Sequence, residues 1–471
     1  MTPAPTQPAQ VGADRSARAY ACALLEACGH TGMRPTLSSP LDAATEWARS
    51  GAMALTGCAD GPPRLAPGPL ALCARGALAA LSTLARGPDA LELDAAALLG
   101  ERAAIAGLAR AGRTAPGRHC RLLAARDGWL ALNLARADDE AMLSAWLECD
   151  RGGGDEAIWD FACRGVAARG RDALVDRGRL MGLPVAPAAE PPSESVAWHR
   201  CDAGGVRRSG RAPDRPRVLD LSSLWAGPLC TSLLERAGAD VIKVESLHRP
   251  DGARRGPAAF FDLINAGKRS VAVDLRAGEG VRLLRSLIDH ADIVVESARP
   301  RALGQLGIDA EACVAARPGL TWLAITGYGR RGPEAGWVAF GDDAAVAAGA
   351  AARTGSAGER PLFCGDAIAD PLTGLHAAVA ALAAHQSGGG VVLDVALCSV
   401  TAHALAWPPA AIDAEPSIRR ADEGHGGATG YVLQVGERTE PVASPRARSV
   451  QARAAALGAD TGAVLDELRV A

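Results

Sequence analysis

The stretch that decides the fold is RVLDLSSLWAGPLCTSLLERAGADVIKVE, residues 217–245. Residues 217–221 form a short apolar run typical of a strand, residues 229–237 have helical spacing, and residues 240–245 form a second apolar run. A strand, a helix and a strand joined by short loops predict two parallel strands of one sheet with the helix packed on its face.

The same alternation continues after this unit. Strands are expected at 270–275, 292–296 and 321–326, with a helix at 279–290. Repetition of the unit predicts an α/β fold with a Rossmann-like parallel sheet as its large domain.

The first two hundred residues have a different pattern. Helical spacing is found at 17–27 and 71–84, and residues 120–125 and 128–133 predict a hairpin about the Arg126-Asp127 turn. No strand–loop–helix unit like the one at 217 is found in this part of the chain.

These patterns divide the chain into four parts. Residues 187–216 are rich in Pro, Gly, Ser and Arg, and we place a linker at 191–216. The predicted order is a disordered tail at 1–15, a first half at 16–190, the linker, and a large domain at 217–471.

Composition excludes several classes of protein. The chain has 471 residues, 48% of them hydrophobic, and a net charge of −3, which predicts a large core and argues against nucleic acid or a membrane as partner. Its twelve cysteines form no C-x-x-C pair, so we expect no metal site and no thioredoxin-type redox site. The amino-terminal segment is not typical of a signal peptide, and a cytoplasmic location is expected.

The chain also resembles itself. Residues 51–85 align without a gap to residues 349–383, and Gly76 falls opposite Gly374. The second copy carries Asp370 where the first has Leu72. A duplicated unit with one working site would have this pattern, although chance similarity within an alanine-rich chain is the alternative.

The loop SSLWAGP at 222–228 follows the first strand and precedes a helix, where backbone N–H groups favour an anion. A dinucleotide site normally has the spacing G-x-G-x-x-G, but the loop contains only Gly227. Glu245 ends the next strand, as a ribose-binding acid would, so a dehydrogenase is a weak alternative.

Charged residues near the predicted strand ends are candidates for binding phosphates or for simple surface charge. The cations are Arg254, Arg255, Lys268 and Arg269. Asp370 precedes Pro371, and from spacing alone it is an N-cap with the proline at the first helical position. A carboxylate at a helix start can also act as a nucleophile.

A family resemblance rests on ordered motifs between residues 217 and 405. Besides the opening stretch, they are NAGKRSVAVDL, ARPRALGQLGID, TGYGRRGP, ADPLTGLHAAVAAL and GGGVVLDVALCSV. In this order and spacing they resemble the family III CoA-transferases of the CaiB/BaiF type. PRAR at 445–448 and LGADTGAVLDEL resemble the closing segment of that family.

The resemblance implies a transferase that uses acyl-CoA and carboxylic acids as substrates and holds no permanent cofactor. Asp370 matches the catalytic aspartate, which would form a mixed anhydride and then an aspartyl-CoA thioester. The residues that fall in CoA-binding motifs are Leu224, Trp225, Ala226, Arg254, Lys268, Ser297 and Arg299.

Two departures keep alternatives open. Ser297-Ala298 stands where many members have Asn-Phe, so a non-catalytic CoA-binding scaffold is one alternative. An α-methylacyl-CoA racemase is the other, but its Gly-His-Asp sequence is Gly341-Asp342-Asp343 in this chain, which lacks the imidazole.

Residues 118–185 resemble the small α+β domain of the family, which normally lies after the catalytic aspartate. We therefore expect a degenerate half-copy whose small domain serves the second half. The chain would then be an intramolecular pseudo-dimer, or a homodimer like other members.

Overall fold

The computed structural model describes most of the chain. The described residues are 16–37, 41–85, 91–136, 138–151, 157–351, 360–408, 414–421, 427–450 and 452–469. The tail expected at 1–15 lies outside them, as does part of the second repeat copy at 352–359.

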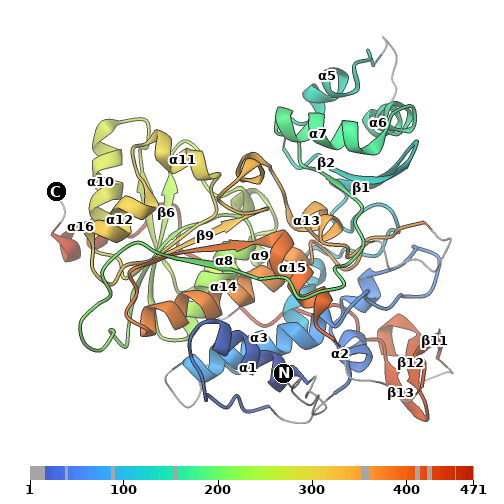
Figure 1. Cartoon of the computed structure of the whole chain (residues 1–471), viewed down its shortest axis with the longest axis horizontal. Coiled ribbons are helices and arrows are strands. Elements are labelled where there is room, and N and C mark those ends of the chain that lie inside the picture. The colour runs from blue at the N-terminus through green and yellow to red at the C-terminus, as the bar shows by residue number, and fades with distance from the viewer. Residues whose placement is uncertain are drawn as a thin grey trace, which may run out of the picture.

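A seven-stranded sheet forms the centre of the molecule (Figure 1). Its order is β4-β10-β9-β8-β5-β6-β7, with β4 antiparallel to β10 and the other neighbours parallel. The strands are β4 (Arg200–Ala203), β5 (Arg217–Leu221), β6 (Asp240–Ser246), β7 (Arg269–Val273), β8 (Ile293–Glu296), β9 (Thr321–Thr326) and β10 (Val391–Ala396).

The strand order confirms the Rossmann-like α/β fold. Counted along the chain from β5, the six parallel strands have the order 3-2-1-4-5-6, which is that of a doubly wound dinucleotide-binding sheet. The order reverses between β5 and β8, which pair directly. Loops that follow these two strands therefore begin side by side at the edge where such folds bind ligands.

Helices cover both faces because the strand side chains alternate between two cores. Val218 and Val241 belong to one core with helices α8 and α14, while Leu219 and Ile242 belong to the other with α10 and α12. The helices of this domain are α8 (Ala226–Arg236), α9 (Ala258–Asn265), α10 (Gly278–Asp289), α11 (Pro300–Gln305), α12 (Ala310–Ala316), α13 (Gly341–Ala347), α14 (Ala369–Gln386), α15 (Leu397–Ala406) and α16 (Thr461–Leu468).

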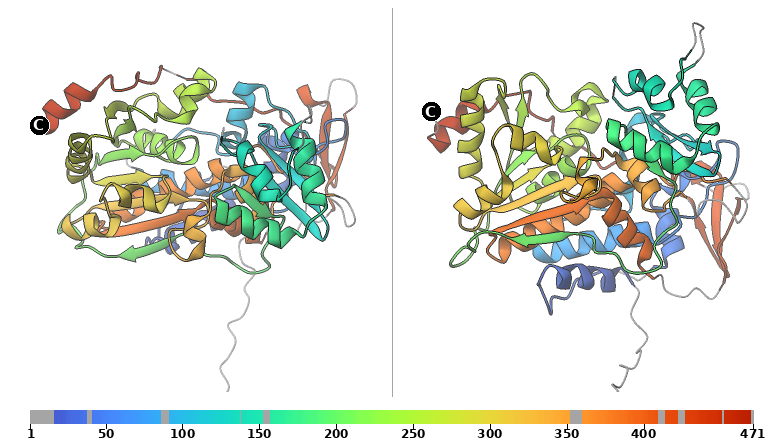
Figure 2. Two further views of the ribbon diagram at one scale, coloured as in Figure 1. Left: turned by 90° about the horizontal axis from the view of Figure 1, so that it is seen from above. Right: turned by 45° about the horizontal axis from the view of Figure 1, so that its top comes forward.

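A small α+β unit lies apart from the sheet, beside α13 (Figures 1 and 2). Its antiparallel strands are β1 (Cys120–Ala125), β2 (Gly128–Asn133) and β3 (Val185–Pro187). Its helices are α5 (Leu143–Leu147), α6 (Ile158–Ala167) and α7 (Arg171–Met181). The predicted hairpin is confirmed with its turn at Arg126-Asp127.

The rest of the first half packs against the large domain. Its helices are α1 (Ala17–Ala27), α2 (Ala43–Arg49), α3 (Leu70–Leu84) and α4 (Glu101–Ala106). Near α2 lies a ribbon of β11 (Ser417–Arg420), β12 (Tyr431–Val435) and β13 (Arg438–Pro441). After it the chain returns across the first half, where Arg448 pairs with buried Glu101.

Two helix pairs cross through aligned glycines. A Cβ on Gly76 of α3 would lie 2.6 Å from the carbonyl oxygen of Ala17 in α1. A Cβ on Gly374 of α14 would lie 2.8 Å from that of Ala226 in α8. The α3 and α14 helices also pack on each other, so the proposed repeat coincides with two similar close crossings.

The segment predicted as a linker contains regular structure. Residues 191–216 include β4, which adds an antiparallel edge strand to β10, and Trp198, which is buried. Within the described part of the chain, no helix is both long enough and apolar enough to cross a membrane.

Candidate active site

The loop between β5 and α8 has a constrained backbone. Leu224 has φ of +71°, a left-handed conformation that is costly for a leucine, and its side chain is 41% exposed. The N–H of Leu224 donates to Asp251 Oδ1 at 2.9 Å, and that of Ser223 donates to Ser297 Oγ at 3.0 Å. Ser297 follows β8, so its hydroxyl joins the two loops at the point where the strand order reverses.

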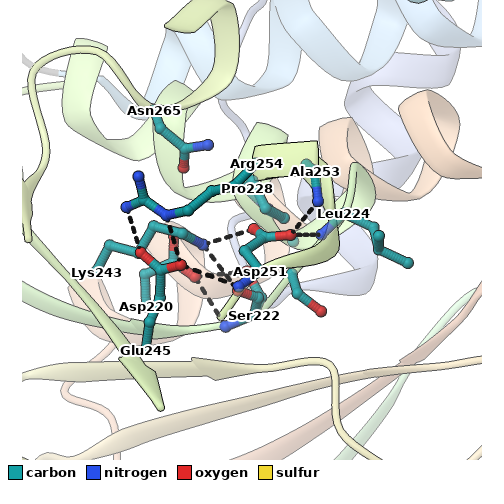
Figure 3. A network of polar contacts seen from close by, with 12 residues as sticks. Asp220, Ser222, Leu224, Pro228, Lys243, Glu245, Asp251, Ala253, Arg254 and Asn265 are labelled. Carbon is teal, nitrogen blue, oxygen red and sulfur yellow. Dashed lines mark hydrogen bonds and ion pairs between the residues drawn. The ribbon is translucent and has the colours of Figure 1, made fainter. Parts of the chain in front are cut away.

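A buried polar network supports this loop from below (Figure 3). Lys243 donates to the carbonyl of Ser222 at 2.9 Å and pairs with Asp251 at 3.0 Å. Lys268 pairs with Asp220 at 3.0 Å and also donates to Asn265. Burial would raise the pKa of Asp220, but the two ammonium groups outweigh it and hold the pKa below its ordinary value.

The two cations predicted to contact CoA phosphates already have protein partners. Lys268 is buried, its ammonium surrounded by oxygens of the chain, and burial lowers its pKa to about 8. Arg254 forms a two-point ion pair with Glu245 and lies over the ring of Phe261 at 4.2 Å. Both support the loop, and a contact with CoA stays a prediction for each.

Arg299 lies in a different environment. It is exposed just after β8, and its pKa is lowered by partial burial and by the positive charges of Arg136, Arg301 and Arg249. Arg136 comes from the small unit and the others from the large domain. Several guanidinium groups near one edge of the sheet create a positive potential suited to a polyanion.

Asp370 lies at the start of α14, where α8 also begins. The backbone N–H of Ala226, the first residue of α8, lies near this carboxylate and acts to lower its pKa. Gly341 leaves room for this carboxylate, since a Cβ there would lie 2.2 Å from Asp370 Oδ2. Asp370 is partly exposed to solvent.

The local geometry corrects the expected N-cap. The α14 helix begins at Ala369, so Asp370 is the second helical residue and Pro371 the third. Ala367 precedes the helix with φ of +43°, another left-handed non-glycine residue. The carboxylate therefore does not cap its own helix, which leaves it available for α8 and for a substrate.

Two more buried carboxylates and an arginine surround Asp370. Asp366 forms an ion pair with Arg102, and Asp342 accepts from the N–H of Ala367 at 2.9 Å. Burial raises the pKa of Asp370 to about 7; Arg102 acts to lower it, and the charges of Asp342 and Asp366 add to the rise. Burial and the charge of Asp366 likewise raise the pKa of Asp342 to about 7.

The small unit also reaches the neighbourhood of α13. Asn133 of β2 donates to Asp343 Oδ1 at 2.9 Å. Arg179 of α7 lies 3.7 Å from the ring centre of Trp337, a cation–π contact across the two halves. The first half thus borders the predicted site on two sides, through α4 and through the small unit.

Sequence reasoning missed Arg102, Asp342 as a neighbour of Asp370, and Asn133. These contacts are hard to predict from local sequence because the partners lie far apart along the chain. Arg102 and Asp366, for example, are separated by 264 residues. In the repeat alignment, Asp366 falls opposite Gly68, as Asp370 falls opposite Leu72. A cavity of about 800 Å³ lies elsewhere, between α2, α3 and the ribbon, and none of the predicted site residues is among its described lining.

The family model described as CoA-transferase family III matches residues 215–435. A succinyl-CoA–D-citramalate CoA-transferase of Chloroflexus aurantiacus is 36% identical over 204 residues, covering 40% of this chain and 51% of that one. A succinate–glutarate CoA-transferase of Agrobacterium fabrum is 35% identical over 207 residues, covering 40% and 52%. The chain thus spans about half the length of these curated relatives.

Among solved structures, a CaiB/BaiF family protein from Brucella suis is 33% identical. That match covers 42% of this chain and 56% of the other, with a TM-score of 0.38. The matched sequence contains β5 to β10 and Asp370 but not the first half of the chain.

Proposed function

We propose that this chain moves CoA from an acyl-CoA to a carboxylic acid, with Asp370 as the nucleophile, because residues 215–435 match the model of CoA-transferase family III. The observation that carries the proposal is the position of Asp370, a partly exposed carboxylate that lies near the backbone N–H at the start of α8. CoA itself would be part of the substrate, and no permanent cofactor is required.

The proposed reaction proceeds through activated acyl groups. The Asp370 carboxylate attacks the thioester carbonyl, and CoA thiolate leaves to give a mixed anhydride. The thiolate then attacks the aspartyl carbonyl, which releases the donor acid and leaves an aspartyl-CoA thioester. An acceptor carboxylate repeats the two steps in reverse order, which regenerates Asp370 and forms the new acyl-CoA.

The surroundings of Asp370 suit this chemistry. Each attack places negative charge on an oxygen, and the amino end of α8 favours negative charge close to the reacting carboxyl. The raised pKa of Asp370, about 7, gives a carboxylate that is more basic than an ordinary aspartate while remaining largely ionised slightly above neutrality.

The CoA moiety would lie at the carboxyl edge of the sheet. Leu224, Trp225 and Ala226 form the loop next to Asp370, and Ser297 fixes that loop to the end of β8. Arg299 and its arginine neighbours supply the positive potential for phosphates. Arg254 and Lys268 would act mainly by supporting the loop.

The decisive experiment measures the mass of the intact protein after incubation with acetyl-, propionyl- and succinyl-CoA. A transferase gains one CoA less one water, and hydroxylamine converts the adduct at Asp370 to a hydroxamate. Asp370→Asn should gain nothing, while Asp466→Asn, an exposed aspartate of α16, should behave as wild type. A non-catalytic CoA-binding scaffold would bind CoA in equilibrium dialysis but never form the adduct.

An α-proton exchange is the second candidate, because Asp342 is buried beside Asp370 and both carboxyls have a pKa raised to about 7. Two carboxyl groups of similar pKa could exchange a proton at the carbon next to a thioester. Loss of deuterium from a 2-methylacyl-CoA labelled at that carbon supports this function. A transferase without racemase activity retains the label.

We also propose that the first half is a degenerate half-copy that serves the second half as a partner subunit would. The aligned glycine crossings and the contact between Asn133 and Asp343 support it. A protein lacking residues 1–200 should be unstable and inactive. A stable, fully active fragment would refute this arrangement.

A further inference from the structure

Arg102 links the first half of the chain to the segment that carries Asp370. Its Nε donates to Asp366 Oδ2 at 2.8 Å and its terminal nitrogen to Asp366 Oδ1 at 2.5 Å. Asp366 is fully buried, whereas the arginine side chain is 28% exposed. A two-point pair of this kind fixes both distance and orientation, so the position of Asp366 depends on α4.

The same guanidinium also contacts the loop before α8. Its central carbon lies 5.3 Å from the ring centre of Trp225, which precedes Ala226 in the chain. Arg102 therefore contacts both Trp225, which precedes Ala226, and Asp366, which lies four residues before Asp370. The backbone of Gly117 also lies close to the Arg102 guanidinium, since a Cβ at this position would be 3.1 Å from one of its terminal nitrogens.

The aligned place in the repeat has no such clamp. Gly68 stands where Asp366 would be, and a Cβ on Gly68 would lie 3.1 Å from the backbone of Leu405. Leu72 stands where Asp370 would be. The aspartate that pairs with Arg102 and the proposed nucleophile are thus both present in the second copy of the repeat, and both are replaced in the first copy.

We propose that Arg102 is a positioning residue for the reaction at Asp370, supplied by the first half of the chain, which holds Asp366 and Trp225 so that Asp370 meets the amino end of α8. This inference rests on the proposed function. The charged groups that face Asp370 are Asp342 from α13, Asp366 from its own segment and Arg102 from α4. Loss of the arginine would leave only carboxylates in that set and favour the protonated, unreactive form of Asp370.

The test compares Arg102→Gln and Arg102→Lys with Arg113→Gln. Arg113 is a matched control because it lies 5.4 Å from the ring centre of Trp129, a similar contact in the same half. We expect kcat to fall roughly 10–100-fold in Arg102→Gln, with KM for acyl-CoA within about threefold. The acid limb of the pH profile should move to higher pH, and guanidinium ion should restore part of the rate of Arg102→Ala.

Arg113→Gln should change none of these quantities, and Arg102→Lys should keep the acid limb but lose rate because it cannot form the two-point pair. A folded Arg102→Gln with an unchanged acid limb and kcat would overturn the proposal. If that variant does not fold, Asp366→Asn, which keeps the arginine but weakens the clamp, must lower kcat; an unchanged kcat would be equally decisive against it.

A second readout separates this inference from the transferase itself. Carbodiimide and an amine label a protonated carboxyl, and peptide mass mapping quantifies the label at Asp370 against pH. The labelling midpoint should be higher in Arg102→Gln than in wild type even if no acyl-CoA is turned over. Equal midpoints would refute the positioning role, whereas failure of wild type to form a CoA adduct would refute only the transferase.

Discussion

Gly76 and Gly374 occupy equivalent places in two helix crossings, each facing the first carbonyl of the helix it crosses, that of Ala17 or Ala226. The distances that a Cβ would have to that oxygen, 2.6 and 2.8 Å, leave no room for a methyl group. Only one of the two crossings carries a reactive group, so the same substitution made in both should separate packing from chemistry.

Gly76→Ala and Gly374→Ala should each lower the free energy of unfolding by roughly 1–3 kcal/mol, because backbone atoms must move apart. Gly374→Ala should also lower kcat, since it displaces α14 from the α8 N–H that meets Asp370. Gly462→Ala is the control: it lies in α16 with no atom near its added Cβ, and it should be neutral or slightly stabilising. Urea denaturation and steady-state kinetics measure both effects; equal kcat in the two crossing variants would contradict the separation.

Transferase activity should rise with pH through about 7, because Asp370 must be ionised to attack and its pKa is raised to about 7. In Asp342→Asn the acid limb of kcat/KM should move to lower pH, since removal of a neighbouring negative charge makes Asp370 easier to ionise. The profile should be measured from pH 5 to 9 at constant ionic strength. An acid limb with a midpoint near the ordinary pKa of aspartate would contradict the raised pKa of Asp370.

Stability should fall as pH rises from about 4 to about 7 because of Asp343, a buried acid in α13. Burial raises the pKa of Asp343 to about 7, so the folded protein keeps a proton there that the unfolded chain loses near its ordinary aspartate pKa. The contribution of Asp343 to the free energy of unfolding is therefore complete below the pKa of the unfolded chain. It is lost as the pH rises through the pKa of the folded protein. Asp343→Asn should flatten this part of the curve of Tm against pH, and an unchanged slope would argue against a protonated Asp343.

Leu72→Asp should create no second active site, although the aligned residue in the other copy is Asp370. Leu72 is 2% exposed, so an aspartate there would be buried without the arginine found near Asp370, and the protein should lose stability by a few kcal/mol, roughly 2–5. The double variant Leu72→Asp with Asp370→Asn should take up no CoA. Any adduct on that protein would mean that the first half retains a working site.

Local pattern was enough for most of the sheet. The β5 and β9 strands have the predicted bounds because their apolar runs end at turn residues. The β4 strand was missed because Arg200–Ala203 is polar and largely exposed, as an edge strand can be. Its partner β10 provides the pairing, and nothing within the four residues themselves indicates it.

The site was only partly predictable for a similar reason. Asp370 is marked by its motif, but the role of Arg102 depends on a pair formed with Asp366 across the fold. Lys268 illustrates a second kind of gap, because its position near a strand end suggests a phosphate ligand and gives no sign of its buried partner Asp220. Charge and position along a chain do not determine which groups are already neutralised.

The buried network beside the loop between β5 and α8 also affects how the protein reacts chemically with its proposed thioester substrate. Lys243 and Lys268 are the only lysines in the sequence, and both are buried in ion pairs. Thioesters slowly acylate exposed lysine amines, which require the neutral form to react. A chain without an accessible lysine side chain should acquire no acyl-lysine at acyl-CoA concentrations that would gradually acylate the lysines of an ordinary protein surface.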